Sequence, residues 1–418
     1  MKQTYINYKD LLNEVELKIY QTETIDKKYI QNLADELFNL SFIDLYCRCL
    51  QIICSYYYHE LDRDNFVYFL DKFKKINDKN NEFGQIYIYM LEGLYSYLKL
   101  ENAEGVRTAK QSLALYHDNK CDDQLLLCKL KYNLGLGYFK IEDYITAFKY
   151  FLEALKCDLH KSCVYHKAFI YQRIGTIESF HGNNKDALFN YLKSAEILKK
   201  NSIFTSSYVS VLNFISSLYF KLKKDDEAYQ YLIDALQRAT ELNLDSQKII
   251  SLSQLGNYYV FKANFEKAEE SLLSAISIAE KQKDANLSYS LLVLGELYIK
   301  MERYDEALQL FNKSLKLLKK LKMNFGIHHL YCRLARLYFQ IEDNEKGEEY
   351  LIKAEKLLPK ITDIDSQKTM YKLFIDYYNS IKNYEKALEY SKLYIALIEQ
   401  LNDAHQRTYL DFFEIKNK

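Results

Sequence analysis

The chain repeats itself with a mean period of 40 residues, and this period limits what it can fold into more than any other feature of the sequence. Each of seven units opens on an apolar residue, which in six units is followed directly by a small residue, and a second small residue lies 13 positions further on. The apolar markers are Leu134, Ile174, Ile215, Leu255, Leu294, Leu334 and Phe374. A fixed period of this length indicates a repeat architecture in which each unit is one supersecondary structure.

Each unit has the pattern of two helices joined by a short polar turn. In the fifth unit, Leu294 and Tyr298 lie one helical turn apart, and Ala307 and Phe311 repeat that spacing after the turn. Glycine inside a helix costs about 1 kcal/mol relative to alanine, so a glycine kept in register, as at Gly295, indicates that two helices approach closely there. We expect the second set of small residues to face the first across this contact. That second set includes Ala147, Ala187, Ala228, Ala268, Ala307 and Ala387.

The composition favours helices throughout the chain. With one proline and eleven glycines in 418 residues, the sequence has too few turn residues for a β-sandwich, a barrel or a disordered segment. Basic and acidic residues number 57 each, so the net charge gives no reason to expect nucleic acid or an anionic membrane as a partner. The eight cysteines form no Cys-x-x-Cys pair, and no signal peptide or membrane-spanning segment is visible. We therefore expect a cytoplasmic protein with reduced, mostly buried cysteines.

The repeated markers resemble those of the tetratricopeptide repeat. In the fifth unit the residues that carry the resemblance are Leu294, Gly295, Tyr298, Tyr304, Ala307, Phe311 and Ser314. The usual unit has about 34 residues, so a longer unit indicates longer helices. Units of this length are similar to those of bacterial peptide-pheromone receptors of the Rap and PlcR-like type, and to tetratricopeptide sensor regions that precede diguanylate cyclase or histidine kinase modules. The resemblance implies an all-α, right-handed α-solenoid, and we expect about nine helix pairs.

Four segments are expected along the chain. Residues 1–41 have the pattern of N-terminal cap helices, and residues 42–121 continue the period as degenerate helix pairs. Residues 122–401 hold the seven clear units, and residues 402–418 have the pattern of an amphipathic C-terminal helix that covers the last unit. Terminal units of a solenoid are atypical because each has a neighbour on one side only.

No catalytic or metal-binding motif stands out. The sequence contains no GxSxG, no P-loop, no GxGxxG after a strand and no HExxH. His328 and His329 are adjacent, so their side chains would point about 100° apart on a helix, and Cys47 and Cys49 would also diverge. We favour solvated or groove-lining histidines over metal ligands and buried thiols over a redox pair, and we expect no cofactor. An enzyme is the least favoured alternative.

The first 62 residues argue against the DNA-binding head that PlcR-like receptors carry at this end. They contain six basic and ten acidic residues, a net charge of −4, and no basic helix. Such a segment is a poor partner for phosphates. We therefore expect a peptide or protein partner, and neither nucleic acid nor a membrane.

The resemblance implies that the first helix of each pair lines a concave groove in which a peptide or protein segment binds. At the implied positions the middle units carry uncharged donors and acceptors, and a carboxamide can bond to both the N–H and the C=O of an extended peptide. The last units carry charged residues, and Arg333 or Arg336 could take a peptide carboxylate through two hydrogen bonds. The predicted groove residues are Tyr132, Asn133, Gln172, Thr176, Asn213, Ser217, Gln254, Asn257, Glu296, Arg333 and Arg336.

Two functional hypotheses follow. The first is a non-catalytic regulator that binds a peptide or protein segment in this groove and relays binding through a change in the superhelix. The alternative is an interaction scaffold, or the sensor part of a larger signalling protein, that docks or forms a homodimer through its terminal helices, above all residues 402–418.

Overall fold

A computed structural model describes most of the chain and shows α-helices without any β-strand among the described residues. The described residues are 2–22, 26–59, 62–76, 82–157, 165–321, 324–360 and 364–399. Packing divides them into two compact units, of which the first ends at Leu222 and the second begins at Lys223. These are unit 1 and unit 2 below.

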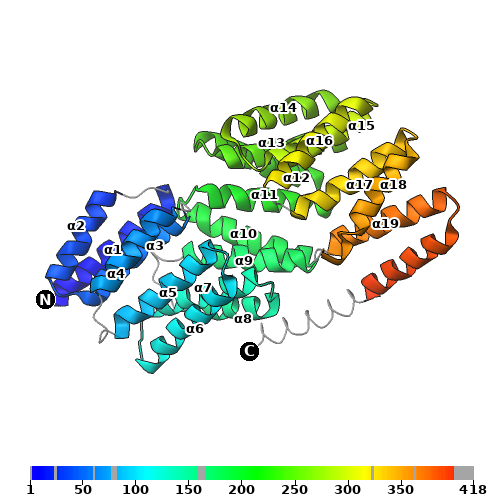
Figure 1. The fold of residues 1–418 in the computed structure, drawn as a ribbon. Coiled ribbons are helices and arrows are strands. Elements are labelled where there is room, and N and C mark those ends of the chain that lie inside the picture. The colour runs from blue at the N-terminus through cyan, green and yellow to red at the C-terminus, as the bar shows by residue number, and fades with distance from the viewer. Residues whose placement is uncertain are drawn as a thin grey trace. The chain divides into compact units, whose positions relative to one another are not determined.

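Unit 1 consists of two N-terminal helices followed by helix pairs (Figure 1). Its helices are α1 (Lys2–Thr22), α2 (Lys27–Asn39), α3 (Ile43–His59), α4 (Arg63–Ile76), α5 (Glu82–Leu98), α6 (Asn102–Asp118), α7 (Gln124–Lys140), α8 (Tyr144–Leu155), α9 (Tyr165–Phe180), α10 (Asn184–Lys200) and α11 (Ser206–Lys221). Within it α3 packs against α4, α5 against α6, α7 against α8 and α9 against α10.

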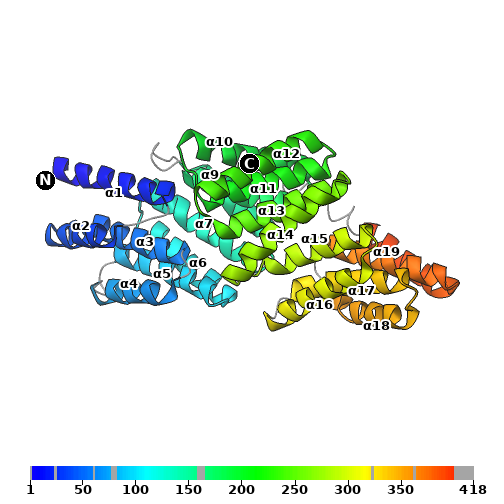
Figure 2. The same cartoon turned by 90° about the horizontal axis from the view of Figure 1, so that it is seen from above.

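Unit 2 continues the same alternation, and Figure 2 shows α16, α17 and α18 lying side by side. Its helices are α12 (Asp225–Glu241), α13 (Asp245–Phe261), α14 (Phe265–Gln282), α15 (Leu287–Lys300), α16 (Tyr304–Lys320), α17 (Asn324–Gln340), α18 (Asn344–Glu355), the 3₁₀ turn η2 (Leu358–Lys360), α19 (Ile364–Ser380) and a helix over 384–399. The helices of unit 1 make four pairs from α3 to α10, and in unit 2 α13 pairs with α14, α15 with α16 and α17 with α18. The predicted all-α architecture with paired helices is confirmed.

Two parts of the predicted organisation remain predictions. The amphipathic C-terminal helix predicted for residues 402–418 lies outside the described residues. The boundaries predicted at residues 41/42 and 121/122 stay predictions, because the division into two compact units is a property of packing and does not test them.

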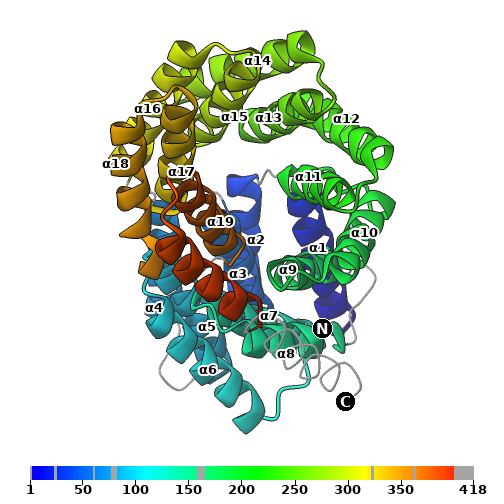
Figure 3. The same ribbon diagram turned by 90° about the vertical axis from the view of Figure 1, so that its right-hand side faces the viewer.

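Each pair also packs against the next pair along the chain. In unit 1, α6 contacts α7 and α10 contacts α11; in unit 2, α14 contacts α15 and α16 contacts α17. Figure 3 shows α9, α10 and α11 as neighbours. The apolar side chains between helices therefore gain their burial from the neighbouring pair as well as from their own, which is the packing expected of a repeat protein.

The close approach predicted at the glycines is present, and the large marker of the second helix fills it. A Cβ added to Gly135 would lie 2.6 Å from the ring of Phe151, and one added to Gly295 would collide with the ring of Phe311. Both rings are fully buried. In these two units the glycine therefore leaves room for a phenylalanine, and the nearest atoms belong to that ring rather than to the second small residue.

Two units add contacts at their small residues. At Gly175 an added Cβ would lie 3.2 Å from the ring of Tyr191 and also 3.2 Å from the backbone oxygen of Ala187, so here the second small residue does face the first, as predicted. In the sixth unit a glycine stands on the second helix, as Gly347, and the ring of Phe339 from the first helix occupies the space above it. This is a separate contact of the repeat, because the residue of that unit that corresponds to Phe151 and Phe311 is the buried Leu351.

From α5 onward the turn inside each pair passes through a residue with positive φ. Glu142 has φ of 64°, and the next residue, Asp143, donates its N–H to the carbonyl of Tyr138 at 3.0 Å, which closes the end of α7. Asp143 also begins α8, because its side chain accepts the N–H of Thr146 at 3.1 Å. One polar residue thus ends one helix and caps the next, which explains the short polar turns of the sequence.

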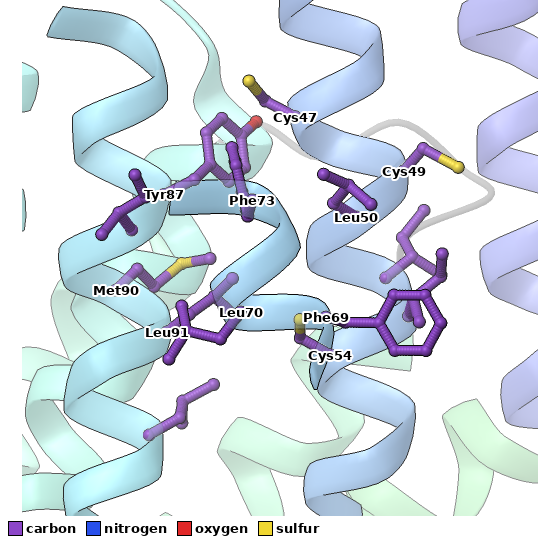
Figure 4. Packing of buried hydrophobic residues seen from close by; sticks show 14 of the residues in the cluster. Cys47, Cys49, Leu50, Cys54, Phe69, Leu70, Phe73, Tyr87, Met90 and Leu91 are labelled. Carbon is purple, nitrogen blue, oxygen red and sulfur yellow. The ribbon is translucent and has the colours of Figure 1, made fainter. Parts of the chain in front are cut away.

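The cysteines of α3 lie in the apolar core of unit 1 (Figure 4). Cys47, Cys49 and Cys54 are buried free thiols, and the first two point to different sides of the helix, as predicted from their spacing. Of the other described cysteines only Cys121 is partly exposed. Cys163 lies outside the described residues.

A buried ion cluster ties α1 to the rest of unit 1. The carboxylate of Glu16 in α1 lies 3.2 Å from Nη2 of Arg48 in α3 and 2.6 Å from Nζ of Lys129 in α7. The Glu16 side chain is 2% exposed. Lys129 also donates to Oε1 of Gln51 at 2.7 Å. One carboxylate therefore holds together three helices that are distant in sequence.

The charges around Glu16 decide its protonation. Burial alone would raise the pKa of Glu16, but the charges of Lys129 and Arg48 outweigh it and lower the pKa to about 2. Because this value is below that of an unfolded glutamate, the ionised cluster stabilises the fold above about pH 4.5, and the stabilisation is lost as the pH falls toward 2.

The positive-φ turns predict a stabilising glycine. Ala263 is exposed and has φ of 55°, a conformation that costs an L-residue about 1–2 kcal/mol. Ala263→Gly removes this strain and should raise the free energy of unfolding by about 0.5–1 kcal/mol, after the larger entropy of the unfolded glycine is counted. Gly182, also exposed, has φ of 77°, so the reverse change Gly182→Ala should lower it by a similar amount. Urea unfolding of both variants measures the two shifts, and equal signs would contradict the assignment.

The ion cluster predicts a pH-dependent loss of stability. The wild-type chain should lose about 3 kcal/mol of unfolding free energy through Glu16 between pH 5 and pH 2. Glu16→Gln leaves Arg48 and Lys129 buried without a carboxylate, so it should lose about 3–5 kcal/mol at pH 7 and show a flatter acid limb. The control is Glu14→Gln, an exposed change on the same helix, which should stay within about 0.5 kcal/mol of wild type. Urea unfolding across this pH range measures both effects, and parallel acid limbs for wild type and Glu16→Gln would show that this carboxylate is not responsible.

Candidate functional site

A hollow of about 610 Å³ lies within unit 1 and is formed by the first helices of successive pairs. We call it the unit 1 hollow. Its polar lining residues are Gln51, Ser55, Lys129, Asn133, Lys140, His166, Gln172, Arg173, Thr205, Ser206, Ser207 and Ser210. Its apolar and aromatic lining residues are Ile19, Tyr56, Tyr58, Met90, Leu94, Tyr132, Leu136, Phe139, Phe169 and Phe214. This volume lies within the range of about 300–1,000 Å³ that ligand sites usually have.

The described lining residues come from α1, from the first helices α3, α5, α7, α9 and α11, and from Thr205 just before α11. The second helices of the pairs contribute none of these described residues. The first helices are therefore the elements that present side chains to a common space in unit 1.

Two carboxamides in the lining are free to bind a ligand. Asn133 is 7% exposed, and its side chain makes no hydrogen bond to any described residue. Gln172 accepts the hydroxyl of Ser207 at 3.1 Å through Oε1, while its Nε2 makes no hydrogen bond within the described part of the chain. An extended peptide offers carbonyl and N–H groups, and these amides can bond to them.

The charges in the lining have one sign. Lys129, Lys140 and Arg173 line the hollow, together with His166, and no aspartate or glutamate does. Lys129 shares the carboxylate of Glu16, which is buried behind it. The hollow is therefore an electropositive space inside a chain whose net charge is zero.

Arg173 has no acidic partner. Its guanidinium contacts the hydroxyl of Tyr132, its Nε is buried and makes no hydrogen bond, and no carboxylate among the described residues lies within ion-pair distance of it. Burial, and after it the charge of Arg173, lower the pKa of Lys140. Burial also raises the pKa of Tyr58 to about 12, so this neighbour of Arg173 is a neutral hydroxyl at pH 7. The two cations thus face one space without a counter-charge.

The structure distributes the predicted groove residues over both units. Tyr132, Asn133 and Gln172 line the hollow. Thr176, one turn beyond Gln172, donates to the carbonyl oxygen of Gln172 at 2.9 Å and lies 3.0 Å from the hydroxyl of Tyr191. Asn213 is buried in α11 and Ser217 is half-buried there, next to the hollow-lining part of that helix but outside the lining.

The remaining predicted residues belong to unit 2. Gln254 and Asn257 lie on α13, where only Asn257 is exposed. Glu296 on α15 accepts an ion pair from Arg333 on α17, with Nε and Oε1 2.7 Å apart. Burial raises the pKa of Glu296, against the opposing charges of Arg333 and Arg336. Arg333, the predicted receptor for a peptide carboxylate, is therefore already paired within the protein.

The prediction from sequence did not include Arg173, Lys140 or Lys129. Arg173 directly precedes the marker Ile174, and Asn133 stands at the same position of its own unit. A comparison of this position in every unit would have found Arg173. Nothing in the sequence places Glu16 of α1 beside Lys129, because that contact joins segments outside the clear repeats.

The described residues offer neither a metal site nor a membrane-spanning helix. Among the described residues no three His, Cys, Asp or Glu side chains are grouped so that they could hold a metal ion. None of the described helices is long and apolar enough to cross a membrane.

Comparison with known proteins agrees with the fold. Models of the tetratricopeptide repeat match residues 207–281, 288–317 and 328–360. A tetratricopeptide repeat-containing protein of Methanocaldococcus jannaschii is 23% identical over 353 residues, which are 71% of this chain and 60% of that protein. The chain thus spans less than two thirds of the length of this relative.

Several solved structures are similar. A Rap protein complexed with Competence and Sporulation Factor has a TM-score of 0.64 and 13% identity, with coverage of 85% of this chain and 99% of that one. NprR in complex with its cognate peptide NprX has a TM-score of 0.51 and 18% identity, with coverage of 94% and 99%. A signal transduction ATPase with a tetratricopeptide repeat sensor from Pyrococcus horikoshii has a TM-score of 0.57 and 15% identity, with coverage of 85% and 55%. Identities this low show the fold alone. The family models show tetratricopeptide repeats at residues 207–281, 288–317 and 328–360, and the 40-residue period and the paired helices agree with them.

Proposed function

We propose that this protein is a non-catalytic, cytoplasmic regulator that binds a peptide or protein segment in the unit 1 hollow. The observation that carries the proposal is the hollow itself, whose wall presents the carboxamide of Asn133 and the Nε2 of Gln172, neither of which makes a hydrogen bond to a described residue. The buried free thiols of the described cysteines suit a reducing compartment. The similar Rap and NprR structures are complexes with a signalling factor and with a peptide, which supports the same class of ligand here.

The position of α1 offers a way to relay binding. Lys129 and Gln51 line the hollow, and both belong to the buried cluster that holds Glu16 of α1. A ligand that contacts either side chain changes the interactions of α1 without touching that helix. Because repeats contact mainly their neighbours, such a change can pass along the stacked pairs at modest cost in free energy.

The alternative, a scaffold or sensor region that docks or dimerises through terminal helices, depends on residues 402–418. Those residues lie outside the described part of the chain, so this alternative remains a prediction.

Filling the hollow tests the proposed function. Ser210 of α11 lines the hollow and is half-buried, so Ser210→Trp places an indole inside it. We expect this variant to bind a pool of randomised hexapeptides at least about tenfold more weakly than wild type, a difference of about 1.4 kcal/mol. Gln172→Ala should weaken binding about fivefold through the loss of one amide. Isothermal titration calorimetry with the full chain measures both.

The matched control is Ser274→Trp, the same change at an exposed position of α14 in unit 2. It should leave peptide binding unchanged. Asn257→Ala tests the part of the predicted groove that lies in unit 2. Wild-type affinity in Ser210→Trp, together with lost binding in Asn257→Ala, would move the site out of unit 1 and contradict the proposal.

A further inference from the structure

We propose that the unit 1 hollow contains an anion subsite, built by Arg173 and Lys140, that takes a carboxylate of the bound peptide. The inference rests on the proposed function, since it assigns a chemical class to the ligand of the same hollow. The carboxylate can belong to the C-terminus of the peptide or to an acidic side chain, and both present the same pair of oxygens.

The local charge is the first argument. Of the cations Arg48, Lys129, Lys140 and Arg173, the first two are ion-paired with Glu16, and the last two make no ion pair with a described carboxylate. Glu16 is shared between the two cations on the side of α1, so it is not available to Arg173 or Lys140. This part of unit 1 therefore has an excess of positive charge that no described residue compensates.

The position of Arg173 is the second argument. Its Nε is buried and unpaired, although a buried arginine is normally held by a carboxylate or by several acceptors. The neighbouring groups are the hydroxyls of tyrosines, which accept a hydrogen bond but supply no negative charge at pH 7. A planar guanidinium with open donors matches the two oxygens of a carboxylate.

Lys140 also lines the hollow and supports the same conclusion. Burial and then the positive charge of Arg173 lower its pKa, so the two cations repel each other. An anion placed between them relieves that repulsion for both groups. The attraction would be strong because charges in a partly buried space are screened less than charges on the surface.

Other arginines of the chain show what a satisfied arrangement looks like. Arg303 in unit 2 lies 3.0 Å from Glu269 and 2.6 Å from Glu306, and Arg333 lies 2.7 Å from Glu296. Arg107 in unit 1 is bidentate to Glu104. Arg173 differs from these in facing a hollow that is lined by free amides, so its missing partner is best supplied by the ligand.

Three pools of N-acetylated hexapeptides test the subsite on the full chain. The first pool has a free C-terminal carboxylate and no acidic side chain, the second has an amidated C-terminus and one glutamate, and the third is amidated and has no acidic residue. We expect the first or the second pool to bind about 10- to 100-fold more tightly than the third, as a charge-assisted bond to a carboxylate predicts. Whichever of the two binds identifies the source of the carboxylate.

The variants assign that preference to a residue. Arg173→Gln should abolish the preference and leave the affinity for the neutral pool unchanged, and Arg173→Lys should restore part of it. Lys140→Gln should reduce the preference without disturbing Tyr132, which keeps the test valid should Arg173→Gln fold poorly. Arg336→Gln tests the carboxylate receptor predicted on α17 and should keep the preference, and the control is Arg107→Gln, an exposed arginine of α6, which should behave as wild type.

The outcomes separate the two proposals. Equal affinity for all three pools, with binding still lost in Ser210→Trp, overturns the subsite and leaves the hollow as a peptide site. Loss of the preference in Arg336→Gln rather than in Arg173→Gln also overturns it. Tight binding of inorganic phosphate without any peptide binding overturns the peptide as the ligand, and the absence of binding by every probe overturns both proposals.

Discussion

The fold depends on one repeated contact, in which a large side chain of one helix fills the space left by a glycine or alanine on its partner. Neither helix of a pair can bury such a ring alone, and the apolar side chains beside it gain burial only when the next pair is in place. The contact therefore sets both the distance between paired helices and the need for neighbours. Phe339 and Gly347 make a further contact of this kind at other positions of the sixth unit, with the ring on the first helix and the glycine on the second.

In unit 1, helix α1 is held by an ion cluster and not by this repeated contact. Its polar residue Glu16 is buried among cations, where an apolar side chain would give comparable stability, because the cost of desolvating ions offsets much of their attraction. The ion pairs add specificity of position, because one carboxylate fixes α1 against both α3 and α7 through defined atoms. The same lysine that anchors α1 also faces the hollow, so the anchoring of the N-terminal helix and the chemistry of the hollow are coupled.

The repeat made most of the fold predictable, since Leu, Gly, Tyr and Ala at fixed spacing determine helix pairs, turns and contacts locally. It also identified Tyr132, Asn133 and Gln172, which share the hollow because the first helices of neighbouring pairs meet there. The ion pairs could not be predicted from the repeat. Arg333 and Glu296 stand in different units of the repeat, and sequence alone could not show that they neutralise each other at 2.7 Å. Glu16 lies before the clear repeats, where no period fixes its neighbours.

The lining of the hollow leaves two cations, Arg173 and Lys140, without an acidic partner among the described residues. A chain with equal numbers of acidic and basic residues could compensate Arg173 and Lys140 with one glutamate among the lining residues, as it does for Arg303 and Arg333 in unit 2. Serines, tyrosines and amides stand there instead. Lys140 and Arg173 are half-buried, and their mutual repulsion costs stability in the empty protein. In the proposed subsite this repulsion becomes binding free energy when an anion enters, and Lys129, which lines the same hollow and pairs with Glu16, is the proposed link to α1.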